Sequence, residues 1–234
     1  MPESKLLLGI DTCGPSGTVA LGRLTGQQIE ILGQKELEGR SYSSTLVAAI
    51  GEMLAHGGGT LREVGAIVAV NGPGSFTGVR VGLAAVKGLV EPTRIPVVAV
   101  SRLEVMGAKA GTPSSALDAH RNEVFLRLGS ALNSEAIGER ARELLAGAHE
   151  FAAIEYPPSR IALCDEAAAL LLGAAWPRVV LVQVEAPTAA DALTLCAPRV
   201  AAEEFVDVAL LDGHYLRRSD AEIFGEAAAA ALGR

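Results

Sequence analysis

Two hydrophobic periods alternate along the first half of the chain and predict a mixture of strands and helices. A continuous apolar run over residues 5–10 and two β-rich segments, 18–23 and 28–37, predict three strands of an antiparallel meander. Apolar residues then recur at the i, i+3, i+4 spacing over residues 41–55. This spacing predicts an amphipathic helix, which the glycines at 57–59 end.

The next segment changes from strand to helix around a glycine-rich turn. Residues 64–70 predict a buried strand, and residues 79–90 predict a helix that ends before Pro92. A further strand is expected at 96–100. Ser101 is a good N-cap for the helix after it, and Glu104 three residues later completes a capping-box pattern.

The second half of the chain is expected to form a smaller subdomain, which begins at the turn of Gly111, Thr112 and Pro113. Pro198 should kink or split the helix that contains it. The expected strands are 115–118, 124–128 and 179–184, and the expected helices are 140–146, 166–172, 188–203 and, in the Ala-rich tail, 227–231. The chain therefore divides into residues 1–109, residues 110–212 and a C-terminal segment, 213–234.

Composition and charge narrow the class of protein. Half of the 234 residues are hydrophobic but only 4% are aromatic, so a core of Ala, Val, Leu and Ile is expected. The net charge of −7 argues against a chain whose main task is to grip nucleic acid. No apolar run reaches the ~20 residues of a membrane span, and residues 6–10 are too short for a signal peptide. A cytoplasmic protein is expected.

Cysteine and histidine are too scattered to predict a metal site. The three cysteines form no CxxC pair and are expected to be small buried apolar residues: Cys13, Cys164 and Cys196. The four histidines form no HxH or HxxxH pair: His56, His120, His149 and His214. Neither a disulfide framework nor a catalytic metal is expected.

The glycine-rich turn at 71–80 is the strongest candidate for chemistry. It lies between a strand and a helix, where free backbone N–H groups and the positive helix end favour an anion. Its spacing fits neither a Walker A loop nor GxGxxG, and Ser75 lacks the flanking glycines of a nucleophile elbow. The alternative, of similar weight, is a tight turn that seats a helix against a sheet.

A second candidate follows the first strand. Asp11 and Thr12, with Gly14 and Gly17 after them, resemble the first phosphate turn of actin, hexokinase and Hsp70, in which an aspartate organises a metal-nucleotide. A capping Asp in a hairpin turn explains the same residues equally well. The two turns together supply the residues expected near a nucleotide or anion: Asp11, Thr12, Gly74, Ser75, Thr77, Gly78 and Arg80.

Several longer strings occur together in this chain. They are LLLGIDT at 6–12, TVAL at 18–21, AIVAV at 66–70, GPGSFTGVRVG at 72–82, AVKGL at 85–89, VSRLE at 100–104, DAHRNEVF at 118–125 and YLR at 215–217. Together they resemble the TsaB (YeaZ) family, closely over residues 5–128 and afterwards only in the last string.

The resemblance implies an α/β protein with the actin-like ATPase (ASKHA, ribonuclease H-like) fold, built of two subdomains with βββαβα repeats. TsaB proteins are described as non-catalytic relatives of TsaD. They pair with TsaD and the ATPase TsaE in forming N6-threonylcarbamoyladenosine beside the tRNA anticodon. TsaD holds its metal with a histidine pair, and the lack of any such pair here agrees with a subunit that does not perform the transfer.

The family reading predicts a scaffold and activating subunit whose two N-terminal helices pack on TsaD. The expected anchors of that interface are Leu46, Ile50, Met53, Leu83, Val86 and Val90. We expect no intrinsic cofactor, ATP or ADP only at the interface of the complex, tRNA contact only through the complex, and a homodimer when no partner is present. The alternatives are an actin-like nucleotide hydrolase or kinase, which would use Asp11 and the glycine loop, and an inactive glycopeptidase-like protein.

Overall fold

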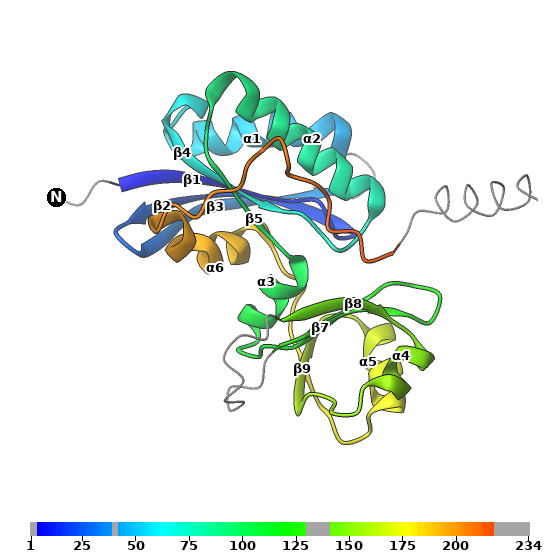
Figure 1. The fold of residues 1–234 in the computed structure, drawn as a ribbon. Coiled ribbons are helices and arrows are strands. Elements are labelled where there is room, and N and C mark those ends of the chain that lie inside the picture. The colour runs from blue at the N-terminus through cyan, green and yellow to red at the C-terminus, as the bar shows by residue number, and fades with distance from the viewer. Residues whose placement is uncertain (1–3, 39–41, 130–140, 218–234) are drawn as a thin grey trace, which may run out of the picture.

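Two mixed five-stranded sheets, one from each half of the chain, form the framework of the protein. The computed structural model describes residues 4–38, 42–129 and 141–217. Figure 1 shows the two sheets one above the other, joined near α3. The predicted terminal helix at 227–231 lies outside the described residues.

The first sheet has the strand order β3-β2-β1-β4-β5. Its strands pair antiparallel from β1 to β3 and parallel from β1 through β4 to β5, which confirms the predicted meander. The elements of this half are β1 Ser4–Asp11, β2 Ser16–Thr25, β3 Gln28–Glu38, α1 Tyr42–His56, β4 Val64–Val70, α2 Phe76–Thr93, β5 Val97–Val100 and α3 Arg102–Lys109, with a short 3-10 turn at Leu61–Glu63.

The second sheet repeats the same order of elements. Its strands are arranged β10-β9-β6-β7-β8, so the βββαβα pattern occurs twice and the predicted actin-like fold class is confirmed. The elements of this half are β6 Ser115–Asp118, β7 Val124–Leu128, β8 Arg142–Ala146, α4 Ala148–Ala153, β9 Arg160–Leu163, α5 Glu166–Ala175, β10 Val180–Gln183 and α6 Ala189–Ala201.

Helices cover both faces of the first sheet. In Figure 1, α1 and α2 lie above the sheet, and α6 lies below it. α6 follows the second sheet in sequence but contacts β1 to β5, so the chain returns to the first half before it ends. A side chain at Gly9 would collide with the Ala189 carbonyl oxygen, 2.8 Å from the position of its Cβ. Glycine in β1 therefore allows α6 to pack close to the sheet.

Three local predictions were wrong or incomplete. Residues 142–146 form strand β8 rather than a helix, because they pair antiparallel with β7 along its whole length. Pro198 lies inside α6, which continues to Ala201 and is not split. Ser101 caps α3, but its hydroxyl donates to Glu143 and no capping box with Glu104 is formed.

Glu143, on β8, ties the two halves of the protein together. Its carboxylate accepts from the Ser101 hydroxyl at 2.7 Å and from Arg127 at 2.6 Å, and it pairs with His214 Nε2 at 2.8 Å. Ser101 begins α3, Arg127 belongs to β7, and His214 lies in the C-terminal segment. Since the Glu143 side chain is only 7% exposed, these partners replace most of its hydration.

Burial alone would raise the pKa of Glu143. The hydrogen bonds from His214, Ser101 and Arg127, together with the Arg127 charge, outweigh burial and lower this pKa below its ordinary value. A carboxyl group with a lowered folded-state pKa contributes stability above its unfolded pKa. That contribution is lost as the pH falls through the folded-state value.

We predict that Glu143→Gln lowers the free energy of unfolding at neutral pH by about 1–3 kcal/mol, because the charged hydrogen bonds are weakened. Urea titrations at neutral pH and at about pH 3 measure the change, and Glu91→Gln on the exposed surface of α2 is the matched control. The variant should lose less stability on acidification than the wild type. An equal loss in both proteins would exclude Glu143 as the source of the acid sensitivity.

Candidate functional site

The ends of several strands meet in one cleft between the two sheets. Its volume is about 910 Å³. The first half contributes the turn after β1, the glycine loop after β4 and Arg102 after β5, and the second half contributes the turns after β6 and β9. Ligands of open α/β folds bind outside the carboxyl ends of parallel strands, so this cleft is the candidate site.

The C-terminal segment borders this cleft and carries the YLR string. The centroids of the Tyr215 and Phe76 rings are 4.7 Å apart. The Arg80 guanidinium carbon lies over the Phe76 ring, 3.9 Å from its centroid. Arg217 donates to the Ala119 carbonyl oxygen at 2.6 Å and also pairs with Glu123. The string therefore connects the first residue of α2 with the β6–β7 turn.

Arg217 supports an unusual turn. Three consecutive residues without glycine's freedom, at positions 120–122, have φ angles near +60° in the left-handed region. The Asp118 carboxylate accepts from the His120 backbone N–H at 2.8 Å inside this turn. Such backbone conformations persist only where the surroundings hold them, and here the Arg217 side chain and Asp118 do so.

Asp11 and Arg102 form a buried ion pair at the floor of the cleft. Arg102 Nε donates to Asp11 Oδ2 at 3.2 Å, and the two side chains are 6% and 2% exposed. The other carboxylate oxygen, Oδ1, accepts from the Cys13 backbone N–H at 2.8 Å. Burial alone would lower the pKa of Arg102, but the Asp11 carboxylate raises it, so the guanidinium stays charged.

The Arg102 guanidinium packs against Gly14 in the turn after β1. A Cβ at Gly14 would be 2.3 Å from Arg102 Nη2, so only glycine leaves room for the arginine at this position. The Tyr42 hydroxyl donates to the Gly14 carbonyl oxygen at 2.9 Å and closes the other side. Burial and the Asp11 charge raise the pKa of Tyr42 to about 12.

A metal-nucleotide of the kind that the actin-like fold implies does not fit these residues. Both Asp11 oxygens already accept hydrogen bonds, one of them from a cation. Among residues 4–38, 42–129 and 141–217, no three His, Cys, Asp or Glu side chains come together as a metal-binding group. The donors on Asp11 therefore occupy the carboxylate that a divalent metal would need.

The glycine loop packs directly on the turn after β1. The Ser75 backbone N–H donates to the Cys13 carbonyl oxygen at 2.8 Å, and the Thr12 hydroxyl donates to the Gly78 carbonyl oxygen at 2.7 Å. The Ser75 hydroxyl caps α2 by accepting from the Gly78 N–H. These contacts correspond to the structural alternative, a tight turn that seats a helix against a sheet.

The structure brings the expected anion-proximal residues to one side of the cleft, but only some of them line it. Gly74 and Ser75 line the cleft, whereas Asp11 and Thr12 are buried beneath it. Arg80 and Thr77 are exposed on α2. Sequence motifs did not identify Arg102 as a site residue. Its signal is an arginine two positions after a strand, where the pattern predicts only a capped helix.

The six expected interface anchors point into the protein. All of them are at most 7% exposed and belong to the core around the first sheet: Leu46, Ile50, Met53, Leu83, Val86 and Val90. They are apolar because they pack α1 and α2 on their own sheet. A charge at Leu83 or Ile50 would therefore test folding rather than docking.

Two cysteines are buried as expected, and the third lies at the cleft. Burial raises the pKa of Cys13 well above its ordinary value and that of Cys196 to about 12. Cys164 lines the cleft half-buried, and burial followed by the Asp165 charge raises its pKa to about 11. All three thiols are free and protonated at neutral pH, so none has the thiolate character of a nucleophile.

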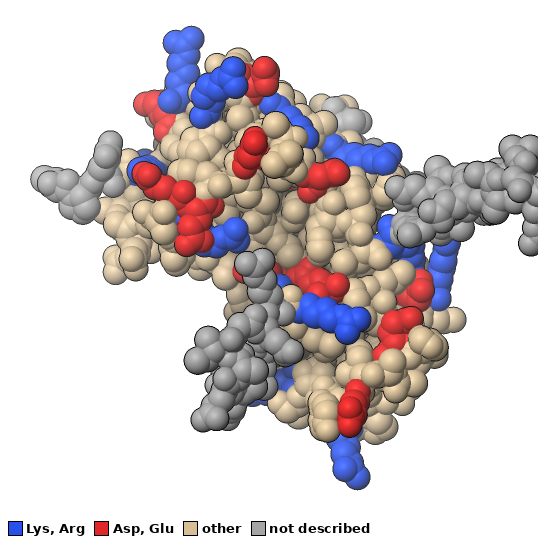
Figure 2. Space-filling model, in the orientation of Figure 1, with Lys and Arg blue, Asp and Glu red and all other residues tan. Residues whose placement is uncertain are grey.

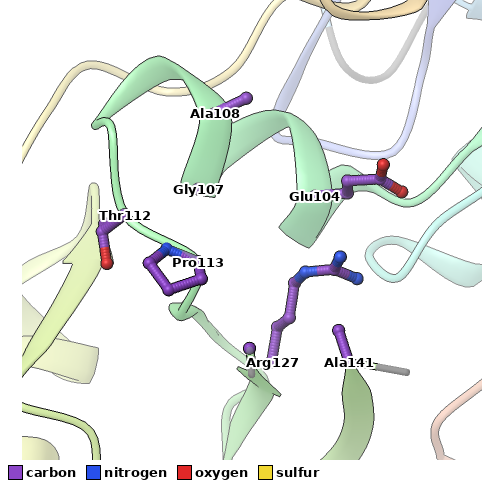
Figure 3. Close-up of a pocket in the computed structure, with 8 residues that line it drawn as sticks. Glu104, Gly107, Ala108, Thr112, Pro113, Arg127 and Ala141 are labelled. Carbon is purple, nitrogen blue, oxygen red and sulfur yellow. The ribbon is translucent and has the colours of Figure 1, made fainter. Parts of the chain in front are cut away.

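A second, smaller pocket of about 370 Å³ lies between α3 and the second sheet. Figure 3 shows Glu104, Gly107 and Ala108 on α3 at one side and Arg127 reaching across from β7. The Arg127 guanidinium is the one that pairs with Glu143. This pocket therefore borders the connection between the halves.

The glycines of α2 supply a matched test of the loop packing. Gly82→Ala places a Cβ 2.2 Å from Thr12 Oγ1 and should lower the free energy of unfolding by about 1–3 kcal/mol. Gly88→Ala, on the exposed side of the same helix with no atom within 4 Å, should leave it unchanged or raise it by up to about 1 kcal/mol. Equal effects in urea unfolding would contradict the packing described here.

Comparison with known proteins agrees with this fold. The family model described as "TsaD: tRNA N6-adenosine threonylcarbamoyltransferase" matches residues 30–169. The tRNA threonylcarbamoyladenosine biosynthesis protein TsaB of Haemophilus influenzae is 35% identical over 129 residues, which are 53% of this chain and 53% of that protein. The chain thus matches about half the length of this curated relative.

Two solved structures extend the comparison to the whole fold. An uncharacterized Pseudomonas aeruginosa protein with similarity to peptidase YeaZ superposes with a TM-score of 0.72 at 25% identity, over 91% of this chain and 100% of that one. Component A of the (R)-2-hydroxyglutaryl-CoA dehydratase of Acidaminococcus fermentans has a TM-score of 0.50 at 11% identity, over 85% and 99%, and shares the fold alone. The chain belongs to the TsaB (YeaZ) family.

Proposed function

We propose that the chain is a non-catalytic scaffold and activating subunit in the formation of N6-threonylcarbamoyladenosine in tRNA. The family match and the printed name of the Haemophilus relative support this role. The buried Asp11–Arg102 pair supports it as well, because the carboxylate that would organise a metal-nucleotide is neutralised by the chain's own arginine. The same pair disfavours the alternative of a nucleotide hydrolase or kinase.

The observation that carries the proposal is a small-residue face on the outer side of α1 and α2. The two helices contact each other and lie together on one side of the first sheet (Figure 1). Their exposed residues include Val47, Ala48, Gly51, Ala84 and Gly88. Val47 is 65% exposed, and no atom lies within 4 Å of a Cβ built at Gly51 or Gly88.

Small residues on two neighbouring helices allow another pair of helices to approach closely. We propose that TsaD, the family's partner, packs its own helices on this small-residue face and that TsaE docks on the resulting complex. In the absence of TsaD, a second copy of this chain would cover the same face as a homodimer. Such an interface would bury about 1,600 Å², the size typical of a stable complex.

The proposal places tRNA contact and any ATP or ADP in the complex rather than on this chain alone. Lys and Arg side chains alternate with Asp and Glu over the face shown in Figure 2, and the coloured residues form no basic patch there. The chain carries a net charge of −7, and phosphate contacts need clustered cations.

No helix among the described residues is long and apolar enough to cross a membrane.

We predict that Ala48→Arg and Ala84→Arg each weaken binding to TsaD by about 100-fold or more, because a buried unpaired charge is costly. Both positions are exposed, so the free energy of unfolding should stay at the wild-type value. Titration calorimetry with purified TsaD and size-exclusion chromatography of the mixture measure the effect.

Thr194→Arg is the matched control, because Thr194 is exposed on α6 at the opposite side of the same sheet. It should bind TsaD as the wild type does. Wild-type affinity in both Ala48→Arg and Ala84→Arg would exclude the small-residue face as the docking surface. A loss of affinity in the control alone would move that surface to α6.

A further inference from the structure

Arg102 has unused donors at the floor of the cleft. Arg102 is only 5% exposed. Its side chain makes one hydrogen bond to a described residue, from Nε to Asp11. No buried side-chain nitrogen or oxygen among the described residues lacks a partner. The two terminal nitrogens of Arg102 have no such partner, so they are not fully buried. Because Arg102 lines the cleft, we infer that these nitrogens are accessible from the cleft.

Arg102 is also positioned between the two walls of the cleft. Its charge acts on Cys13 at the first wall and on Cys164 at the second, where in each case it opposes the larger effect of burial on the thiol pKa. A guanidinium presents its N–H groups in a planar fork that suits the two oxygens of a carboxylate or phosphate. Here Nε of that fork donates to the Asp11 carboxylate, and the two terminal nitrogens have no hydrogen bond to another described residue.

The two carboxylates that line the cleft are already occupied by other donors. Asp165 accepts from the backbone N–H groups of Asp118 at 3.1 Å and Ala168 at 2.9 Å. Asp118 pairs with His120 Nδ1 at 2.8 Å. These partners reduce the repulsion that an incoming anion would meet.

The rest of the lining is largely apolar. Phe76 and Tyr215 contribute a pair of rings from the first half and the C-terminal segment. Leu117 and Phe125 face the cleft from the second sheet. A ligand that combines an oxyanion with an apolar or aromatic group would match both parts of this surface.

We propose that the cleft binds a small organic anion, a carboxylate or phosphate monoester with an apolar or aromatic group, and that Arg102 holds its oxyanion without a divalent metal. Arg102 thus supplies the positive charge at the point where the fold would otherwise use a cation. The inference goes beyond the proposed scaffold role and does not depend on it, because the small-residue face lies on α1 and α2, outside the cleft.

The experiment uses phenyl phosphate and benzoate as probes in buffer that contains EDTA. Inorganic phosphate and acetate represent their separate oxyanions, and phenol represents the separate aromatic group. Titration calorimetry and ligand-observed NMR measure binding to the wild-type chain. We expect phenyl phosphate or benzoate to bind more tightly than either half, and the stronger of the two identifies the oxyanion. Failure of both organic anions to bind at millimolar concentration, or binding that appears only when Mg²⁺ is added, would overturn the proposal.

Variants of the ion pair give changes of opposite sign. Asp11→Asn removes the carboxylate that competes for the guanidinium and should tighten binding several-fold. The double variant Asp11→Asn with Arg102→Gln keeps a neutral pair in the core and should weaken binding by about tenfold or more. The loss of affinity in the double variant is specific to Arg102, because both variants lack the Asp11 charge.

Arg23→Gln is the control, since Arg23 is exposed on β2 and does not line the cleft. It should bind the probes as the wild type does. Equal affinity of the wild type and the double variant would mean that the probe binds elsewhere on the chain and would overturn the site. TsaD binding, measured on the same variants, should remain intact, so failure of the anion site and failure of the scaffold role are distinguishable.

Discussion

The ion pair between Asp11 and Arg102 is the constraint on which the candidate site depends. It joins the end of β1 to the start of α3, and both partners are almost fully buried. Removing two charges from water is costly, and a lone buried charge is costlier still, so each partner requires the other. Gly14 then has to be glycine because the guanidinium fills the space of a side chain. The local sequence of the turn follows from the arginine beneath it.

The same turn determines the shape of the glycine loop. Gly74, Gly78 and Gly82 each face the backbone or hydroxyl group of residues 12–13 at distances that no Cβ could occupy. The loop is therefore sterically demanding: its glycines allow α2 to lie against the end of β1. A second set of contacts, centred on Glu143 and continued by the YLR string, connects this half to the second sheet. The cleft between them is formed by packing and ion pairs on both sides.

Much of the first half could be predicted from periodicity, since β1 and β4 contain continuous apolar runs and α1 is amphipathic. The second half was harder, and residues 142–146 show the reason. Five residues with two polar and three apolar side chains can form either a helical turn or a strand, and pairing with β7 decides the outcome. The apolar positions of α1 and α2 were recognised correctly, but periodicity cannot tell a side chain buried by its own sheet from one buried by a partner. Arg102 was missed because its role depends on Asp11, 91 positions away in sequence.

These observations describe a chain that keeps the architecture of an actin-like enzyme and uses its charged residues for internal contacts. The central claim is that Arg102 takes the place of a metal beside Asp11. A titration with Mn²⁺, followed by the paramagnetic relaxation of water protons, tests it most directly. The account predicts no stoichiometric Mn²⁺ site in the wild-type chain. One Mn²⁺ bound per chain, and lost in Asp11→Asn, would contradict it.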